Sequence, residues 1–212
     1  MKIYKLTAQD MTTYNDCHWQ LGKWKKTSGK GHLCSSGWLH GYESAELAVL
    51  LNTIHADVRN PKLFIAEAAG SFKTDGLKLG VSRMRLAQEI KLPRFTTAQR
   101  VALAILVSYP FCKRALPSSE SSAWARWADH WLDGSDRSQK AAMEAGTLAW
   151  EKGAMAGRKA TAAATAATWG AKWATATAVM EAAVAVVEAM ESAGDADFPM
   201  FLHICIEACK DF

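Results

Sequence analysis

Apolar and polar side chains alternate along residues 3–7, which is the period of a half-buried strand. Residues 18–21 continue that pattern before a basic turn at 23–31, and residues 38–40 are again strand-like. The chain therefore starts by building a sheet.

Two further strands are expected after a helix. Ser44 stands as an N-cap before a helical run at 45–55, and Asn60-Pro61 then turns the chain. Residues 63–68 read as a strand that ends at Gly70, and residues 77–90 suit one or two more strands.

The pattern changes to helix after Pro93. Thr96 and Gln99 have the spacing of a capping box before the apolar run 101–107, and Pro110 or Pro117 is expected to end that helix. A second helix over 119–132 places its tryptophans at spacings of three and four, typical of a stripe that faces a core. These tryptophans are Trp124, Trp127 and Trp131.

Residues 136–193 contain 21 alanines, which gives this stretch a high intrinsic helix preference. Its glycines offer places to turn, so we expect two or three antiparallel helices rather than one rod. Residues 195–199 break the pattern before a last amphipathic segment at 200–209. The predicted fold class is α+β: a small mixed sheet with a packed helix over 1–93, then an all-α, alanine-rich module over 94–212.

The net charge of +4 is unevenly distributed. Residues 1–94 carry 14 Lys and Arg against 8 Asp and Glu, whereas residues 95–212 carry 11 against 13. A basic front half is compatible with an acidic protein partner, a nucleic acid or the acidic half of the same chain.

The sequence predicts a cytoplasmic protein that does not enter a membrane. Its first twenty residues include Lys2, Lys5, Asp10 and Asp16 instead of an apolar run, and no apolar stretch reaches the length of a membrane span. We expect the five scattered cysteines to be free thiols in a reducing compartment.

Two groups of potential metal ligands occur. Cys17-His18, His32-x-Cys34 and His40 fall in the front module, and His203, Cys205 and Cys209 fall in the last segment. Neither group has the paired Cys-x-x-Cys spacing of a zinc site, so packing is the favoured interpretation and no metal or cofactor is predicted.

The sequence lacks a nucleophile elbow, a phosphate loop and a dinucleotide fingerprint, so we predict that the protein is not an enzyme. One enzymatic alternative is an NAD-dependent ADP-ribosyltransferase, whose layout of strands the front half faintly resembles. Glu89 would then supply the acidic residue late in the sheet.

Aromatic and cationic residues alternate in the basic turn, as a nucleic-acid surface could require. Trp24 is flanked there by Lys23, Lys25 and Lys26. A solvated basic hairpin explains the same pattern, so binding of a nucleic acid or a nucleotide-like ligand is the alternative and not the favoured function.

Several short motifs of the front half are similar to a small domain family common in phage and prophage proteins. They are Tyr4-Lys5, the run from Cys34 to Trp38, His40, Ala45, Ala48 and the run from Ala66 to Gly70. Leu39 separates Trp38 from His40, which are usually adjacent in that family. No activity is known for the family, so the resemblance of residues 2–92 implies a phage origin and no catalysis.

The helical half resembles the alanine-rich domains of immunity proteins over residues 124–190. The matching positions include Trp124-Ala125, Ala128-Asp129, Asp136-Arg137, Lys140-Ala141, Glu144-Ala145-Gly146, Ala149-Trp150 and Gly153. Immunity proteins neutralise a protein target by binding it, and the resemblance implies such a role here.

These observations favour a phage-type protein that binds and inhibits a host protein, such as a component of a CRISPR or other antiviral defence, in the host cytoplasm. The expected contact residues are Trp24 with its flanking lysines, and Arg126, Asp129 and Asp133 on the second predicted helix. Homodimer formation is left open.

Overall fold

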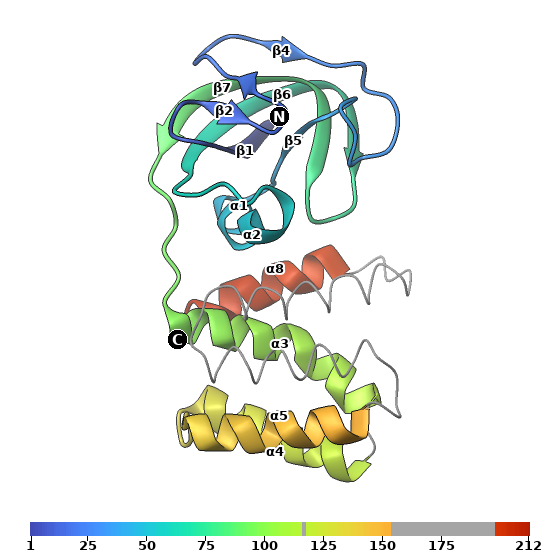
Figure 1. The fold of residues 1–212 in the computed structure, drawn as a ribbon, viewed down its shortest axis with the longest axis vertical. Coiled ribbons are helices and arrows are strands. Elements are labelled where there is room, and N and C mark those ends of the chain that lie inside the picture. Colours follow the sequence, from blue (N-terminus) through green and yellow to red (C-terminus); the bar gives the residue numbers. More distant parts are fainter. Residues whose placement is uncertain (116–117, 154–197) are drawn as a thin grey trace. The chain divides into compact units, whose positions relative to one another are not determined.

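The computed structural model describes residues 1–115, 118–153 and 198–212. The chain divides into two compact units, Met1–Arg94 and Phe95–Phe212, and each is described by itself (Figure 1). The first unit is an antiparallel sheet with two short helices and the second is helical, which confirms the predicted α+β class.

An antiparallel sheet forms the first unit. Its strands are β1 (Lys2–Thr7), β6 (Lys62–Thr74), β7 (Leu79–Ile90), β4 (Lys25–Lys26) and β5 (Leu39–Gly41). They run in the order β1-β6-β7-β4, and β5 also pairs with β7. The long β6–β7 hairpin is therefore the centre of the sheet (Figure 1).

The sheet curls until its two sides meet. Directly after β5, Tyr42 donates a backbone hydrogen bond to Tyr4 of β1 and accepts one from it, at N···O distances of 2.9 and 2.8 Å. Gly41 allows this approach, because a Cβ there would lie 2.8 Å from Ile3 Cδ1 and 3.0 Å from Tyr4 O. A second, two-stranded sheet of β2 (Thr12–Thr13) and β3 (Cys17–His18) follows β1.

The interior of the curled sheet is apolar and compact. Its core cluster consists of Ile3, Trp19, Leu39, Phe64, Ala66, Ala68, Leu79, Val81, Met84 and Leu86, all below 9 % exposed. The strand predicted at 3–7 is confirmed, but both of its faces are covered. Ile3 and Thr7 are 0 % exposed, and Leu6 on the opposite face is 3 % exposed.

The prediction that Gly70 ends its strand is wrong. β6 continues to Thr74, and Gly70 lies at an irregularity in the pairing with β7 between Ala69 and Phe72. With φ at +85°, Gly70 adopts a conformation that side chains disfavour, and it changes the direction of the strand without ending it.

The helix predicted at 45–55 is two helices, α1 (Ala45–Leu50) and α2 (Asn52–His55). Ser44 caps α1 as expected, since its Oγ accepts a hydrogen bond from the Leu47 N–H at 3.1 Å. The break is at Leu51, where ψ is 1°, and Asn52 then holds Val58 through two hydrogen bonds. These two bonds hold the segment that follows α2 against the first residue of that helix.

Four described helices belong to the second unit: α3 (Thr97–Ala115), α4 (Ser118–Asp133), α5 (Gln139–Gly153) and α8 (Phe198–Cys209). α3 packs against α4 and α8, and α4 packs against α5. None of the helices in the described part of the chain is long and apolar enough to span a membrane.

The capping box that starts α3 is confirmed. The Thr96 N–H donates to Gln99 Oε1 at 2.9 Å, and the Gln99 N–H donates to Thr96 Oγ1 at 3.1 Å. Of the two prolines expected to end this helix, Pro110 does not do so, because α3 continues to Ala115. An interior proline costs about 3 kcal/mol, and burial of the apolar run at 101–107 offsets that cost. Pro117 lies outside the described residues.

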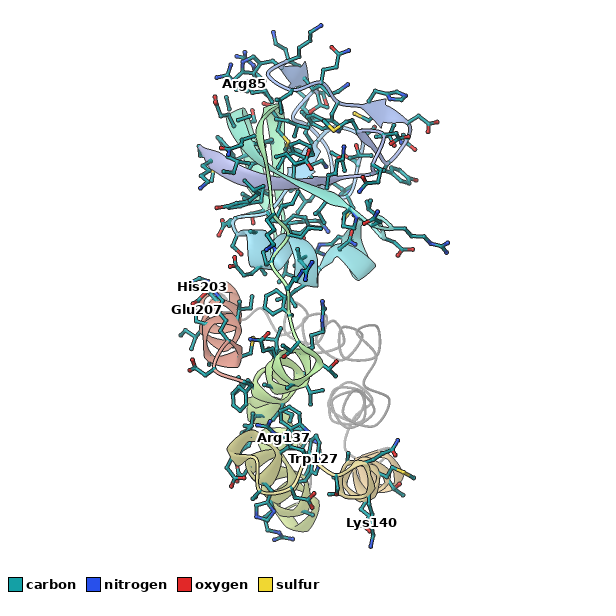
Figure 2. All side chains as sticks on the ribbon, turned by 90° about the vertical axis from the view of Figure 1, so that its left-hand side faces the viewer. Arg85, Trp127, Arg137, Lys140, His203 and Glu207 are labelled. Carbon is teal, nitrogen blue, oxygen red and sulfur yellow. The ribbon has the colours of Figure 1, made fainter. Side chains whose placement is uncertain are left out.

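The tryptophan stripe of α4 faces the core, as predicted. Trp124, Trp127 and Trp131 are 2, 5 and 4 % exposed. Arg137 lies over the Trp131 ring at 4.7 Å and over the ring of Phe212 at 5.8 Å, and Figure 2 labels Arg137 and Trp127 within this group of helices. Of the alanine-rich stretch predicted at 136–193, α5 is described, and residues 154–193 lie outside the described residues.

We predict that Gly70→Ala destabilises the first unit more than Gly22→Ala does. Both glycines have positive φ, at +85° and +75°, so both alanines carry a backbone cost of roughly 1–2 kcal/mol. Only at Gly70 would the new Cβ also collide, at 2.2 Å from Ser82 Oγ, whereas at Gly22 nothing lies within 4 Å. Ser82 Oγ accepts the Ser71 N–H at 2.8 Å, so its displacement also breaks that bond. Urea unfolding of both variants measures the difference, and equal losses would contradict the account.

Candidate functional site

A cavity of about 440 Å³ opens in the first unit, between β1, the β2–β3 turn, β5 and the end of α2. Four of its lining residues carry basic groups, four are aromatic, and others carry hydroxyl or thiol groups. In that order they are Lys5, Lys78, His40 and His55; Tyr14, Trp19, Trp38 and Tyr42; and Thr13, Thr27, Ser35, Ser36, Cys17 and Cys34. The cavity thus combines cations with flat apolar rings.

Lys5 reaches the cavity because of the period of its strand. Successive side chains of a strand alternate between faces, so Lys5 shares a face with the buried Ile3 and Thr7. Its ammonium lies 5.6 Å from the centroid of the Trp19 ring, and Lys25 lies 5.7 Å from the same ring. The Lys5 side chain has no ion pair with any carboxylate of the described residues.

Burial lowers the pKa of Lys5 to about 8, and only the nearby Cys17 acts in the opposite direction. Desolvation is the dominant cause because it penalises the charged ammonium in a cavity that offers it no anion. A buried cation without an anionic partner lowers the folding stability of a small domain.

The second lysine of the cavity is neutralised by a partner. Lys78 Nζ lies 3.4 Å from Asp75 Oδ2, and the Lys78 and Leu77 N–H groups also donate to Asp75 Oδ1. Burial alone would raise the pKa of Asp75, but these hydrogen bonds keep it below its ordinary value. Lys5 is therefore the lysine of the cavity that lacks a carboxylate.

Burial favours the neutral form of both histidines of the cavity. Burial lowers the pKa of His55 to about 4, and it also lowers the pKa of His40. His40 Nε2 contacts Leu33 O, which can only accept, so Nε2 carries the proton and Nδ1 is the acceptor. His55 stacks on Tyr42 with ring centroids 6.0 Å apart.

Two lining residues hold buried polar atoms without a partner among the described residues. They are Thr27 Oγ1 and His55 Nδ1. A buried polar atom without a hydrogen bond costs about 1–3 kcal/mol, so a water or a ligand group that binds either atom would recover that energy. These two atoms are therefore candidate hydrogen-bonding positions for a molecule bound in the cavity.

The two groups of potential metal ligands noted in the sequence form no metal site among the described residues. Among the residues that the structure describes, no three His, Cys, Asp or Glu side chains are placed to hold a metal ion. Cys17, Cys34 and His40 line the cavity, while His18 and His32 are exposed and do not. At the end of the chain, burial raises the pKa of Cys205 to about 12 and that of Cys209 to about 11, as expected of packed thiols.

Trp24, predicted as a contact residue, lies at the surface and is 37 % exposed. The guanidinium groups of Arg83 and Arg85 lie 5.0 and 5.1 Å from its ring centroid. Arg85, labelled in Figure 2, is also held by Glu67 at 2.7 Å. The structure therefore adds two arginines from β7 to the predicted basic surface.

The flanking lysines do not all share that position. Lys23 and Lys26 are exposed, and Lys26 pairs with Arg83 across β4 and β7. Lys25 is half-buried, with its ammonium over Trp19. The basic turn thus contributes to two different faces.

The second predicted surface, on α4, is exposed, but two of its three residues have bonds within the chain. Asp129 accepts a hydrogen bond from the Tyr109 hydroxyl at 3.0 Å, and Asp133 accepts one from the Ser135 N–H at 2.8 Å. Arg126 is exposed on the same helix. These contacts give Asp129 and Asp133 structural roles irrespective of any partner.

Sequence reasoning missed Lys5 and His55 as site residues and considered Glu89 instead. Glu89 is exposed on β7 and does not line the cavity. The sequence does show that Lys5 shares a strand face with Ile3 and Thr7, which could have indicated a buried lysine. The alternation of one strand, however, does not show which of its faces other elements cover. The stacking of His55 depends on the break at Leu51, which the sequence pattern did not indicate.

We predict that Lys5→Met raises stability at pH 7 by on the order of 1 kcal/mol, since it removes a half-buried charge. Because the pKa of Lys5 is lower in the folded than in the unfolded state, the unfolded chain binds more protons between about pH 8 and 10.5. Wild-type stability therefore gains from Lys5 deprotonation as the pH rises through that window. The advantage of the variant should shrink over the same range.

Thermal unfolding of both proteins at several pH values measures this difference, with Lys2→Met, an exposed position on the same strand, as the control. An advantage of Lys5→Met that stays constant from pH 7 to 10.5 would contradict a desolvated ammonium at this position.

Comparison with known proteins finds one family. No curated protein and no solved structure matches the chain. The model of one domain family, whose description is "Domain of unknown function (DUF7666)", matches residues 1–98. This range includes the whole sheet and every residue that lines the cavity. The match to this family model therefore spans residues 1–98, less than half of the chain, and the residues that line the pocket lie within the matched range.

Proposed function

We propose that the first unit is a binding module for a small organic anion that carries a flat ring. The observation that supports this most is the cavity around Lys5, in which an ammonium without a carboxylate partner lies beside aromatic side chains. None of the residues that line this cavity is Asp or Glu. An anionic group is thus the guest that best complements its charge.

The size and the lining of the cavity fit such a ligand. Pockets for small molecules measure about 300–1,000 Å³ and combine apolar rings with a few polar groups, and this cavity measures about 440 Å³. Its volume suits a single-ring acid or a mononucleotide. The unpartnered Thr27 Oγ1 and His55 Nδ1 would give the ligand two hydrogen-bonding positions.

The walls formed by Trp19, Trp38 and Tyr42 are fixed before any ligand binds. Trp19 Nε1 donates to Thr13 Oγ1 at 3.0 Å, and Trp38 Nε1 donates to Gly31 O at 3.3 Å. Trp38 and Tyr42 are 7 and 5 % exposed. Rings that are already immobile lose little conformational entropy on binding, which favours affinity.

Binding of adenosine 5′-monophosphate to the full chain, compared with adenosine, tests the proposal by calorimetry. We expect the nucleotide to bind more tightly than the nucleoside, because its phosphate can accept a hydrogen bond from Lys5. Lys5→Met should weaken nucleotide binding by roughly tenfold to a hundredfold, since a hydrogen bond to a charged group contributes about 1.5–3 kcal/mol. Lys2→Met is the matched control and should bind like the wild type.

Failure of both probes to bind would argue against an anion pocket of this size. Equal affinities of the wild type and Lys5→Met would remove Lys5 from the proposal.

The second candidate is the predicted inhibitor of a host protein, with its phage origin. Trp24 is the observation that favours it, because an exposed tryptophan beside Arg83 and Arg85 has the composition of an interface anchor. The same two guanidinium groups already lie over the Trp24 ring and compete with a base that would stack on it. This surface therefore suits a protein partner better than a nucleic acid.

For this candidate we predict that a protein captured by the chain from a bacterial lysate is lost with Trp24→Ser and retained with Met143→Ser. Met143 is the control because it is 46 % exposed and lies on α5 of the second unit. Capture that is indifferent to Trp24 would contradict an anchor at this position.

A further inference from the structure

Lys5 differs from the other lysine of the cavity in its surroundings. On β1 it shares a face with Ile3 and Thr7, which are 0 % exposed, and its ammonium lies over a ring and not beside a carboxylate. Its charge interacts with Cys17 of β3 and His40 of β5, and the ammonium of Lys25 of β4 lies over the same Trp19 ring. Lysines in such desolvated, anion-free positions are the ones that serve as nucleophiles.

We propose that Lys5 captures an aldehyde or ketone group of the bound anion as a reversible imine. The inference rests on the proposed function, because the same pocket must first hold the anion. It adds that the natural ligand carries a carbonyl group within reach of Lys5 Nζ.

The step needs no oxidant and no reductant. The lone pair of the neutral amine forms a bond to the carbonyl carbon, and the electron pair of the C=O π bond moves to oxygen, which gains a proton. That proton comes from the nitrogen and leaves a carbinolamine; its hydroxyl group then departs together with the remaining N–H proton as one water, and the C=N bond forms. The sum is one amine plus one carbonyl compound giving one imine plus one water.

The pocket supports this chemistry in three ways. A pKa of about 8 leaves roughly one tenth of Lys5 neutral at pH 7, against less than one in a thousand for an ordinary lysine. His40 lines the same cavity, and burial lowers its pKa, which favours the neutral imidazole that accepts a proton. An apolar lining also favours the loss of water.

Reductive trapping on the full chain tests the inference. The protein is incubated with 4-formylbenzoate, a flat anion with an aldehyde group, and sodium cyanoborohydride, which reduces the imine to a stable secondary amine. Peptide mapping by mass spectrometry then compares labelling at Lys5 with labelling at Lys2 and Lys25. We expect Lys5 to be modified at least about tenfold faster at pH 7, with its rate levelling off above pH 8.

Adenosine 5′-monophosphate should protect Lys5 and leave Lys2 unprotected. Lys5→Arg should abolish the pocket adduct, whereas Lys2→Arg should not affect it; circular dichroism of each variant confirms that it folds. Because mapping of the wild type already identifies the site, the test does not depend on either variant.

Labelling of Lys5 no faster than that of Lys2 would overturn the imine. If the nucleotide still binds in a Lys5-dependent manner, only this inference fails and the anion pocket stands. If the nucleotide does not bind either, both proposals fail.

Discussion

The first unit depends on the closure of its sheet between Tyr4 and Tyr42. Two backbone hydrogen bonds join these residues, and they form only because Gly41 has no side chain to collide with Ile3 and Tyr4 O. Without this closure, β5 would pair with β7 alone, and the residues before it would have no fixed position over β1. The closure thus brings His40 of β5 and Lys5 of β1 to the same cavity.

The closure of the sheet also explains why the pocket lowers the stability of the first unit. A curled sheet covers both faces of β1, so a lysine in register with Ile3 and Thr7 is turned inward. A fold selected only for stability would place an apolar residue there, since the ammonium has no carboxylate to offset its desolvation. Positions that break a packing rule in this way are where binding sites are expected.

Local patterns predicted much of the fold. The Ser44 cap, the Thr96–Gln99 capping box and the tryptophan stripe of α4 are set by residues within a turn or two of one another, and all three are present. The errors arose where distant contacts decide. β6 passes through Gly70 because β7 pairs with it on both sides of the irregularity, and α3 passes through Pro110 because its apolar face is buried.

The site was less predictable than the fold, for the same reason. Lys5, His40 and His55 come from three separate elements, so no spacing along the chain relates them. The basic turn was predicted as a binding surface because its charged residues are adjacent in the sequence. In the structure, Trp24 lies at the surface beside Arg83, whereas Lys25 lies over the buried Trp19 ring.

Direct titration of Lys5 tests the central claim, that this ammonium lies desolvated in an anion pocket. In protein with ¹³C-labelled lysine, the Lys5 Cε resonance, assigned by its absence in Lys5→Met, is followed with pH, first alone and then with adenosine 5′-monophosphate. We expect a titration midpoint near pH 8 in the free protein, in line with the lowered pKa. The nucleotide should shift this midpoint upward, because a bound anion stabilises the ammonium. A midpoint near 10.4, the ordinary value for lysine, that the nucleotide leaves unchanged would contradict it.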